Sequence, residues 1–217
     1  LEESKQLLEA MGIPCLQAEG EGEEAAAYLV NSGKVWAAAS QDYDALLYGS
    51  KQLVRNLTLS RRRRTSTGEY VEVKPELITF SDVLNKLQLN HEQLICLGIL
   101  VGTDFNPGGI KGIGQKTALN IAIKNKYAYE IFKYIKKSDK YFLDFNWQEI
   151  FQEFRKKDAK PISDKEIEKL QFNKLNKEKV KEILIKRDFF FFFIDSGLQK
   201  LEKVEDEKKQ KGLNQFI

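Results

Sequence analysis

The sequence predicts an α/β fold in which a parallel sheet is followed by a mainly helical region. At the start of the chain, helix-like segments alternate with short, continuous apolar runs, which is typical of a parallel sheet covered by helices. From Ser81 onward, the spacing of apolar residues is helical almost throughout. The chain has 217 residues, of which 42% are hydrophobic and 31% charged, and this is enough to bury a substantial core.

Two helix–strand pairs are predicted at the start of the chain. Residues 1–11 have apolar side chains at helical spacing, and the short apolar run at 15–16 follows them as a strand. Residues 21–31 predict a second helix with one apolar face. The continuous apolar run at 35–39 predicts a strand that is buried on both faces, because such runs lack the alternation of a half-exposed strand.

The middle of the chain predicts a strand pair, and the remainder predicts helices. Residues 52–58 and 70–73 have the composition of strands and flank an arginine run, so we expect them to pair through a basic loop. The charged and polar end of the chain predicts a flexible tail. Helical spacing predicts helices at 81–87, 91–101, 115–124, 127–136, 163–170, 177–186 and 194–205.

The composition and the cysteines narrow the class of protein. No stretch of about 18 apolar residues occurs and no secretory signal is seen, so no membrane span is predicted. Cys15 and Cys96 lie in apolar stretches without metal-ligand spacing, which indicates reduced core residues in a cytoplasmic protein. The net charge is +3, but acids gather near Glu21 while arginines run from Arg61 to Arg64. Such segregation fits a metal site beside a polyanion.

Two pairs of carboxylates and a fifth acid are the candidate metal ligands. Glu21 and Glu23 lie at the start of a predicted helix, where the helix dipole favours negative charge. Asp42 and Asp44 follow the second predicted strand, and in an extended segment two such side chains point the same way. Asp104 follows a predicted apolar helix. Ligands of parallel sheets bind beyond the carboxyl ends of the strands, and Asp42 and Asp44 lie at such an end.

Carboxylates without a neighbouring His or Cys cluster favour Mg²⁺ or Mn²⁺ over zinc. Two such ions, about 3.5 to 4 Å apart, can activate water and stabilise the leaving oxygen in phosphodiester hydrolysis. No twelve-residue loop has the acid spacing of a calcium-binding EF-hand. The alternative is that each pair consists of ordinary solvated acids, the commoner role of acids at loop and helix ends.

A glycine-rich segment, Gly108–Thr117, separates two predicted helices. Its glycines allow close backbone approach to another molecule, and its N–H groups precede a helix. This geometry binds phosphate, and Lys111 and Lys116 add positive charge, so a nucleic-acid backbone is the expected ligand. The alternative is an ordinary tight turn. The segment lacks the preceding strand and the spacing of a nucleotide-binding fingerprint.

Four ordered motifs in this part of the chain resemble the flap endonucleases, a family of the XPG/Rad2 nucleases. Two further segments resemble the archaeal members in particular. Because the motifs occur in order between residues 18 and 117, chance agreement is improbable. The motifs are AEGEGEEA at 18–25, ASQDYD at 39–44, LVGTDF at 100–105 and GIKGIG at 109–114, and the archaeal segments are YVEVKPELI at 70–78 and NPGG at 106–109.

The resemblance implies a PIN-like α/β nuclease domain with a parallel-type sheet, then a helix-two-turn-helix that grips duplex DNA, and C-terminal helices. The implied regions are the nuclease core at 1–105, the helical DNA-binding region at 106–207 and a clamp-binding tail at 208–217. Two Mg²⁺ ions, replaceable by Mn²⁺, serve the site in this family, and the helix-two-turn-helix often holds K⁺. By position, Glu21, Glu23, Asp42, Asp44 and Asp104 match the catalytic metal ligands, and Lys111, Gly112, Gly114, Lys116 and Thr117 match the DNA-binding loop.

The implied function is that of a structure-specific 5'-flap endonuclease with 5'-3' exonuclease activity, acting on branched DNA in replication and repair. Such an enzyme is expected in the cytoplasm of an archaeal cell, associated with the nucleoid. A junction resolvase or a long-range 5' exonuclease fits the compact length less well. A non-catalytic DNA- and clamp-binding module is a further alternative, against which the retention of all five acids argues.

Two features depart from the family pattern. The N-terminal part, which in the family supplies the first strand, two further aspartates and a helical arch over the 5' end, is not in this sequence. We therefore expect this chain alone to be weak or inactive, with activity restored by a separate N-terminal chain. Phe189–Phe193 replaces the mixed polar residues usual in the family. We expect this run to be a helix end packed in the core, with an exposed partner-binding patch as the alternative.

The end of the chain matches the pattern by which proteins bind the sliding clamp PCNA. Its spacing is Gln, two residues, an aliphatic residue, two residues and then two large apolar residues, although the last is not the usual aromatic. A single helical turn would place the apolar side chains on one face for a hydrophobic pocket. The matched residues are Gln210, Leu213, Phe216 and Ile217.

Overall fold

The computed structural model describes residues 2–57, 62–64, 66–155 and 162–213. The chain forms two compact units. The central unit comprises Ala18–Ile162, and the terminal unit combines Leu1–Gln17 with Ser163–Ile217. The predicted domain division at residues 105 and 207 stays a prediction.

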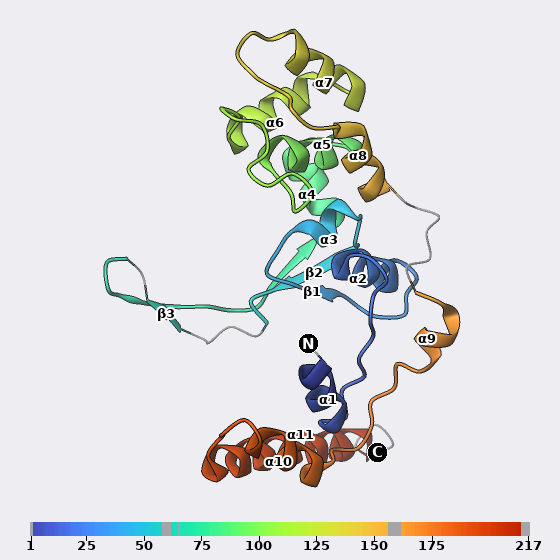
Figure 1. Ribbon diagram of the computed structural model, residues 1–217, viewed down its shortest axis with the longest axis vertical. Helices are drawn as coiled ribbons and strands as arrows, with labels where there is room; N and C mark the ends of the chain where they lie inside the picture. Colours follow the sequence, from blue (N-terminus) through green and yellow to red (C-terminus); the bar gives the residue numbers. More distant parts are fainter. Residues whose placement is uncertain (1, 58–61, 65, 156–161, 214–217) are drawn as a thin grey trace. The chain divides into compact units, whose positions relative to one another are not determined.

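A mixed three-stranded sheet lies in the central unit. Strand β1 (Ala38–Ala39) runs parallel to β2 (Gln52–Arg55), which pairs antiparallel with β5 (Glu76–Thr79). Helices α2 (Gly22–Asn31) and α3 (Asp44–Leu47) pack beside it, and Figure 1 shows both near β1 and β2. The buried core here consists of Val30, Ala38, Ala45, Leu46 and Leu53. The expected parallel pairing is therefore present between β1 and β2.

Strand β1 is shorter than the run predicted at 35–39. Val35 and Trp36 precede the strand with 40% and 67% of their surfaces exposed, and Ala39 is also exposed. In the described chain, β1 has β2 as its partner on one side only. Helix α2 packs against β1, but no described strand pairs with its other edge and Ala39 is exposed, so the prediction of a doubly buried strand was wrong.

Three residues of the arginine run, Arg62–Arg64, form a strand and not a loop, and Arg61 lies outside the described residues. Strand β3 (Arg62–Arg64) pairs antiparallel with β4 (Tyr70–Glu72), while β2 pairs with β1 and β5. Figure 1 shows this hairpin projecting from the three-stranded sheet. The predicted pairing of 52–58 with 70–73 was therefore wrong, because hydrogen bonding of β2 to β5 leaves β4 to the arginine strand.

Helices make up the rest of the central unit. They share one apolar core, which includes the fully buried Ile95, Ile99, Ile131 and Phe132. Four match the predicted ranges within a residue or two, whereas α8 was not predicted, although its buried residues Trp147, Ile150, Phe151 and Phe154 have helical spacing. These helices are α4 (Phe80–Leu87), α5 (His91–Val101), α6 (Gln115–Lys124), α7 (Ala128–Lys137) and α8 (Trp147–Arg155).

The two ends of the chain build the terminal unit. Helices α1 (Glu2–Ala10), α9 (Asp164–Glu168), α10 (Lys177–Ile185) and α11 (Phe191–Leu213) belong to it. Its buried core consists of Ala10, Val180, Ile194 and Leu198. The helices were predicted, but the strand expected at 15–16 is irregular chain that forms no ladder with any described residue. Cys15 is half-buried and Cys96 is buried, and both are free thiols.

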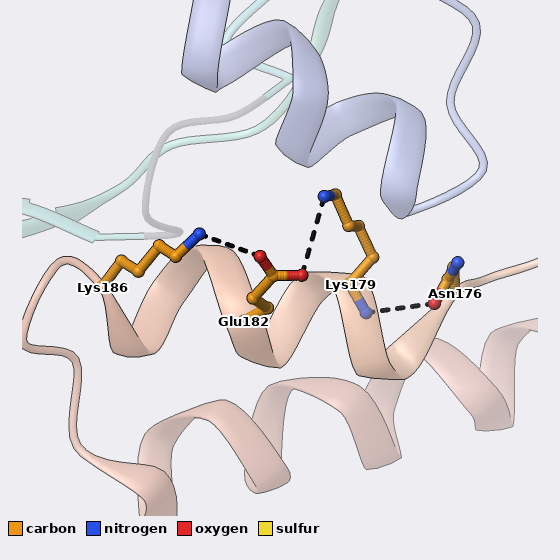
Figure 2. Close-up of polar contacts among 4 residues, drawn as sticks. All are labelled: Asn176, Lys179, Glu182 and Lys186. Carbon is orange, nitrogen blue, oxygen red and sulfur yellow. Dashed lines mark hydrogen bonds and ion pairs between the residues drawn. The ribbon is translucent and has the colours of Figure 1, made fainter.

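Helix α10 is stabilised by local contacts on its exposed surface. The Asn176 side chain accepts a hydrogen bond of 3.0 Å from the Lys179 N–H and so caps the helix. Glu182 lies 2.8 Å from Lys186 and 3.6 Å from Lys179, as Figure 2 shows. The hydrogen bond from Lys186, together with both nearby ammonium charges, lowers the pKa of Glu182. These contacts stabilise the helical conformation of α10, against which α1 packs.

The phenylalanine run is exposed. Phe189 to Phe193 have between 55% and 78% of their surfaces accessible, so the expected burial in the core was wrong. The run lies at the start of α11, which is longer than predicted and extends to Leu213. No described helix is long and apolar enough to cross a membrane.

Candidate metal centre and nucleic-acid interface

The first acid pair lies at the N-terminus of α2, as predicted. Glu21 is the N-cap residue, but its side chain makes no capping hydrogen bond, and Glu23 lies in the first turn. The helix dipole favours both charges there. A Cβ added at Gly22, between the two acids, would meet no heavy atom within 4 Å, so this end of the helix is open.

Ser40 joins the two acid pairs. Its hydroxyl donates a hydrogen bond of 3.3 Å to Oε1 of Glu23 and accepts one of 3.1 Å from the Asp42 N–H. Its own N–H donates to the Val54 carbonyl at 3.2 Å, which continues the pairing of β1 with β2. The end of the sheet therefore positions α2 relative to the loop that carries the second pair. Sequence reasoning missed Ser40 because serine before an acid is common in loops.

The second acid pair is not in extended chain. Tyr43 has helical dihedral angles, and Asp44 is the first residue of α3. The alternation argument therefore does not apply, although the pair still lies beyond the carboxyl end of β1. Arg55 of β2 fixes this loop, because its Nε donates to the Gln41 carbonyl at 3.0 Å and its guanidinium lies 4.2 Å from the centre of the Tyr43 ring.

The fifth acid, Asp104, lies in a loop that folds back on the end of α5. Buried Asn106 holds this loop: Oδ1 accepts from both the N–H and the hydroxyl of Thr103, and Nδ2 donates to the Ile99 carbonyl at 2.8 Å. Gly102 has a φ of +120°, and a Cβ there would lie 2.7 Å from the Gly109 nitrogen. Only glycine fits this close approach. The role of Asn106 was not recognised from the sequence.

All five acids contribute to one electrostatic site. The pKa of Asp44 is raised, first by burial and then by the charges of Asp104, Asp42, Glu23 and Glu21. The other four acids therefore lie near enough to Asp44 to disfavour its ionisation. Oxygen donors of this kind suit hard divalent cations. Among the described residues, no three acids, histidines or cysteines are close enough to hold one ion.

The pKa of Tyr48, just after α3, is affected by some of the same acids. Burial raises the pKa of its hydroxyl, and the charges of Glu24, Glu21, Glu153 and Asp44 raise it further. Its ring packs against Phe154 of α8, with 4.8 Å between ring centres. Tyr48 therefore links the acid site to the helical core and stays protonated at neutral pH.

The glycine loop between α5 and α6 has an exposed tip. Gly112 has a φ of +86°, and Gly114 is the N-cap of α6 in extended conformation. A Cβ at either position would meet nothing within 4 Å, so the backbone is open to an incoming molecule. Lys111 and Lys116 are exposed beside it, and Thr117 is half-buried in the first turn of α6. The start of α6 is thus an accessible helix N-terminus with two exposed lysines beside it, and its binding of phosphate stays a prediction.

A single groove borders both candidate sites. Its volume is about 930 Å³, and its lining includes Asp42, Asp44 and Asp104 at one part and Gln115 and Lys116 of α6 at another. The remaining lining is largely apolar and comes from α3, α4, α5 and β5. The acid cluster and the start of α6 are therefore accessible to the same bound molecule.

The predicted clamp-binding residues are only partly within the described chain. Gln210 and Leu213 belong to the last turns of α11. Phe216 and Ile217 lie outside the described residues. The assignment of a clamp-binding tail therefore stays a prediction.

The chain is similar in sequence to a known protein family and to proteins of known name. A family model described as the XPG I-region matches residues 12–104. Flap endonuclease 1 of Sulfolobus acidocaldarius is 45% identical over 223 residues, which cover all of this chain and 62% of that protein. Flap endonuclease 1 of Sulfurisphaera tokodaii is 47% identical over 224 residues, with the same shares covered.

The fold has a counterpart among solved structures. Flap endonuclease 1 from Methanococcus jannaschii is similar to this structure with a TM-score of 0.71 and 35% identity, covering 95% of this chain and 58% of that one. The chain therefore spans about three-fifths of the length of the relatives that it matches.

Proposed function

The chain belongs to the archaeal flap endonuclease family, and on that premise we propose that it carries the metal-binding acids and the duplex grip of a structure-specific 5'-flap endonuclease. The proposed substrate is branched DNA, cut at the base of a 5' flap, with 5'-3' exonuclease activity at the same site. The observation that carries this proposal is the single groove bordered by three of the acids and by the start of α6. A DNA strand whose phosphates are bound at the start of α6 can extend along that groove toward the acids.

The donor set supports a divalent cation site. Its proposed ligands are Glu21, Glu23, Asp42, Asp44 and Asp104, which combine half-buried and exposed carboxylates around Asp44. Two bound Mg²⁺ ions, or Mn²⁺ in their place, would supply Lewis acidity and lower the pKa of a bound water. A K⁺ ion at the loop between α5 and α6 stays a prediction of the family resemblance.

The chain's own residues have two tasks in this proposal. The N–H groups at the start of α6, with Lys111 and Lys116, bind the phosphates of the duplex without reading bases. Ser40 and Asn106 are positioning residues, because each holds a loop that carries one or more acids. The exposed glycine backbone lets a phosphate approach closely, which a side chain at Gly114 would prevent.

Two partners are also proposed. The first is a separate N-terminal segment of the nuclease, which the family resemblance requires for the remaining acids and for the arch. The second is the sliding clamp PCNA, which the pattern at Gln210, Leu213, Phe216 and Ile217 fits. Replacing Leu213 and Phe216 by alanine is expected to abolish co-elution with the clamp on gel filtration, and unchanged co-elution would refute this assignment.

The activity is tested with a 5'-flap DNA in Mg²⁺, using this chain alone and mixed with a separately expressed N-terminal part. We expect cleavage in the mixture, little by the chain alone, and loss of at least a hundredfold in rate for Asp42→Ala. Asp139→Ala, which removes an exposed acid away from the groove, is the matched control and keeps the rate. If duplex binding persists but neither preparation cleaves, the chain is a non-catalytic DNA- and clamp-binding module.

A further inference from the structure

A second surface of the central unit combines lysines with aromatic rings. Helix α7 buries one face, which includes Ile131, Phe132 and Ile135. Its opposite face presents Tyr129 and Lys133 one turn apart, followed by Lys136 and Lys137 another turn on. All four side chains are exposed, and Tyr129 has 65% of its surface accessible. This surface is named the α7 stripe.

The α7 stripe borders a recess against the start of α8. The recess has a volume of about 200 Å³, and the four stripe residues line it together with Gln148. Its inner wall is rigid, because Phe132 and Trp147 stack with 4.2 Å between ring centres and only 10° between ring planes. None of its lining residues borders the groove of the acid site. Figure 1 shows α7 at the end of the unit remote from the three-stranded sheet.

The charge of this surface is not neutralised locally. Within the described part of the chain, no carboxylate forms an ion pair with Lys133, Lys136 or Lys137. The nearby Glu130 instead accepts from the Tyr127 N–H at the start of α7, and Glu149 accepts from Asn146 at the start of α8. Three uncompensated ammonium groups along one helix face attract a linear anion with regularly spaced charges.

We propose that the α7 stripe binds single-stranded DNA, with phosphates on the three lysines and one base against Tyr129 and the recess. Aromatic rings interleaved with cations are the arrangement by which single strands bind without sequence reading. The recess is smaller than the roughly 300 Å³ at which sites for drug-sized ligands begin, and it suits one base. Lys133 lies 5.5 Å from the centre of the Tyr129 ring, so one residue pair can contact both base and phosphate.

A single strand fits this surface better than a duplex does. In a duplex, base faces are stacked on one another, so only phosphates could reach the stripe and Tyr129 would contribute little. In a single strand, each base has a free face for an aromatic ring. The proposal is independent of cleavage, because it uses no residue of the acid site.

The test measures binding of a fluorescein-labelled oligothymidylate, about 16 nucleotides long, to the full chain in EDTA by fluorescence anisotropy. The variant Lys133→Ala/Lys136→Ala/Lys137→Ala is expected to bind at least tenfold more weakly, with a salt slope reduced by about two. The matched control Lys165→Ala/Lys169→Ala/Lys174→Ala removes the same charge from exposed positions of the terminal unit and keeps both values.

The base contact is tested separately. Tyr129→Ala is expected to weaken binding about five- to a hundredfold, whereas Tyr134→Ala, an exposed tyrosine of α7 outside the recess, changes it little. Equal losses in the two lysine triples, or no loss for Tyr129→Ala, would overturn the proposal. A blunt duplex that loses as much affinity as the oligothymidylate would overturn it as well, in favour of a phosphate contact to duplex DNA. The binding assay is run in EDTA, which removes divalent ions, so it measures binding without cleavage. A failed flap-cleavage assay would therefore leave the outcome of this test unchanged.

Discussion

Ser40 shows how one hydroxyl can connect two segments that carry acids. It donates to the carboxylate of Glu23 in α2 and accepts from the N–H of Asp42, and its own N–H, just after the end of β1, donates to the Val54 carbonyl. Groups that orient metal ligands in this way are worth roughly tenfold to a hundredfold in metal affinity. Serine is equally frequent in loops that do nothing of the kind, so only the coordinates reveal its partners.

We therefore expect Ser40→Ala to weaken Mn²⁺ binding by about tenfold without unfolding the protein. The measurement is an isothermal titration of the mixture with the N-terminal part, accompanied by circular dichroism. Ser32→Ala is the matched control, since the Ser32 hydroxyl donates only to the Leu29 carbonyl, 3.2 Å away on the surface. Equal affinities for Ser40→Ala and the parent would exclude this positioning role.

The raised pKa of Asp44 predicts how the stability of the fold depends on pH in the absence of metal. Its pKa is raised in the folded chain by burial and by the four other acids, so the unfolded chain loses this proton at lower pH than the folded chain does. The contribution to stability is therefore full below the ordinary pKa of 3.8 and is lost as the pH rises through the folded pKa. Above that window, ionised Asp44 destabilises the fold.

Asp44→Asn is accordingly expected to raise the Tm at pH 7 in EDTA, with the gain shrinking toward pH 4. The rise should be a few degrees at most, because the side chain is half-buried and water screens the repulsion. In saturating Mg²⁺ the order should reverse, since bound metal stabilises the parent more than the variant. Thermal melts followed by circular dichroism check both signs, and a lower Tm for the variant in EDTA would contradict the argument.

Among the elements, the loop from Gly109 to Gly114 contains two glycines that differ in what their backbone conformation requires. Gly112 has a φ of +86°, a conformation that is strained for any other residue. Gly114 has an ordinary extended conformation with open space around it, so nothing in the fold requires glycine there. Gly114 can therefore be replaced without backbone strain, which makes it a suitable position to test whether a bound molecule approaches the backbone.

Gly114→Ser is thus expected to keep or slightly raise stability, because serine is a good N-cap residue, while weakening duplex binding several-fold. Gly112→Ala should instead cost about 1 kcal/mol of unfolding free energy through backbone strain. Urea denaturation and fluorescence anisotropy with a short duplex distinguish the two. Duplex affinity unchanged by Gly114→Ser would remove the α6 N-terminus from the proposed interface.

Local sequence patterns predicted most of the helices, whereas the extent and pairing of the strands depend on the neighbouring strands. The apolar run of α5, the amphipathic spacing of α6 and α7 and the acids at the start of α2 were sufficient to place these elements and the first acid pair. Strand β1 was predicted too long because its burial depends on neighbours. The arginine strand was missed because β2, the expected partner of β4, pairs instead with β5. The exposure of Phe189–Phe193 was missed for the same reason, since composition alone predicts burial.

The residues of the candidate site were named from the sequence, and their role as metal ligands stays a prediction. The charges of the other four acids all raise the pKa of Asp44, but the extended segment invoked for Asp42 and Asp44 is a turn followed by a helix. The groove that links them to Lys116 depends on the packing of α3, α4 and α5, which no local pattern specifies. The hydrogen bonds of Asn106 likewise bring together residues whose individual types are ordinary for a loop.

At the scale of the whole molecule, the two compact units predict separate stabilities. The central unit, residues 18–162, contains both the acid site and the glycine loop and has a core of its own. Residues 163–217 lack α1, and without Ala10 they expose the apolar surfaces of Val180 and Ile194. We expect the fragment 18–162 to unfold cooperatively by itself and the fragment 163–217 to be largely unfolded.

Calorimetry and circular dichroism of the two fragments test this expectation. Adding a peptide of residues 1–17 should restore helicity to the fragment 163–217, whereas the same peptide with Gly12→Ala should not. In the intact chain a Cβ at Gly12 would lie 2.2 Å from the Asn173 carbonyl oxygen, so alanine cannot fit. Full helicity of the fragment 163–217 without the peptide would show that α1 is dispensable for its folding.

The assembly of the terminal unit from both ends of the chain has a consequence for biosynthesis. Helix α1 leaves the ribosome about 165 residues before α10, its packing partner, so it must wait while the central unit emerges and folds. Joining α1 to α10 across a denatured chain would require closing a long loop, which is slow. Helix α1 therefore has no packing partner until α10 has been synthesised, so we expect the terminal unit to be the last part of the chain to fold.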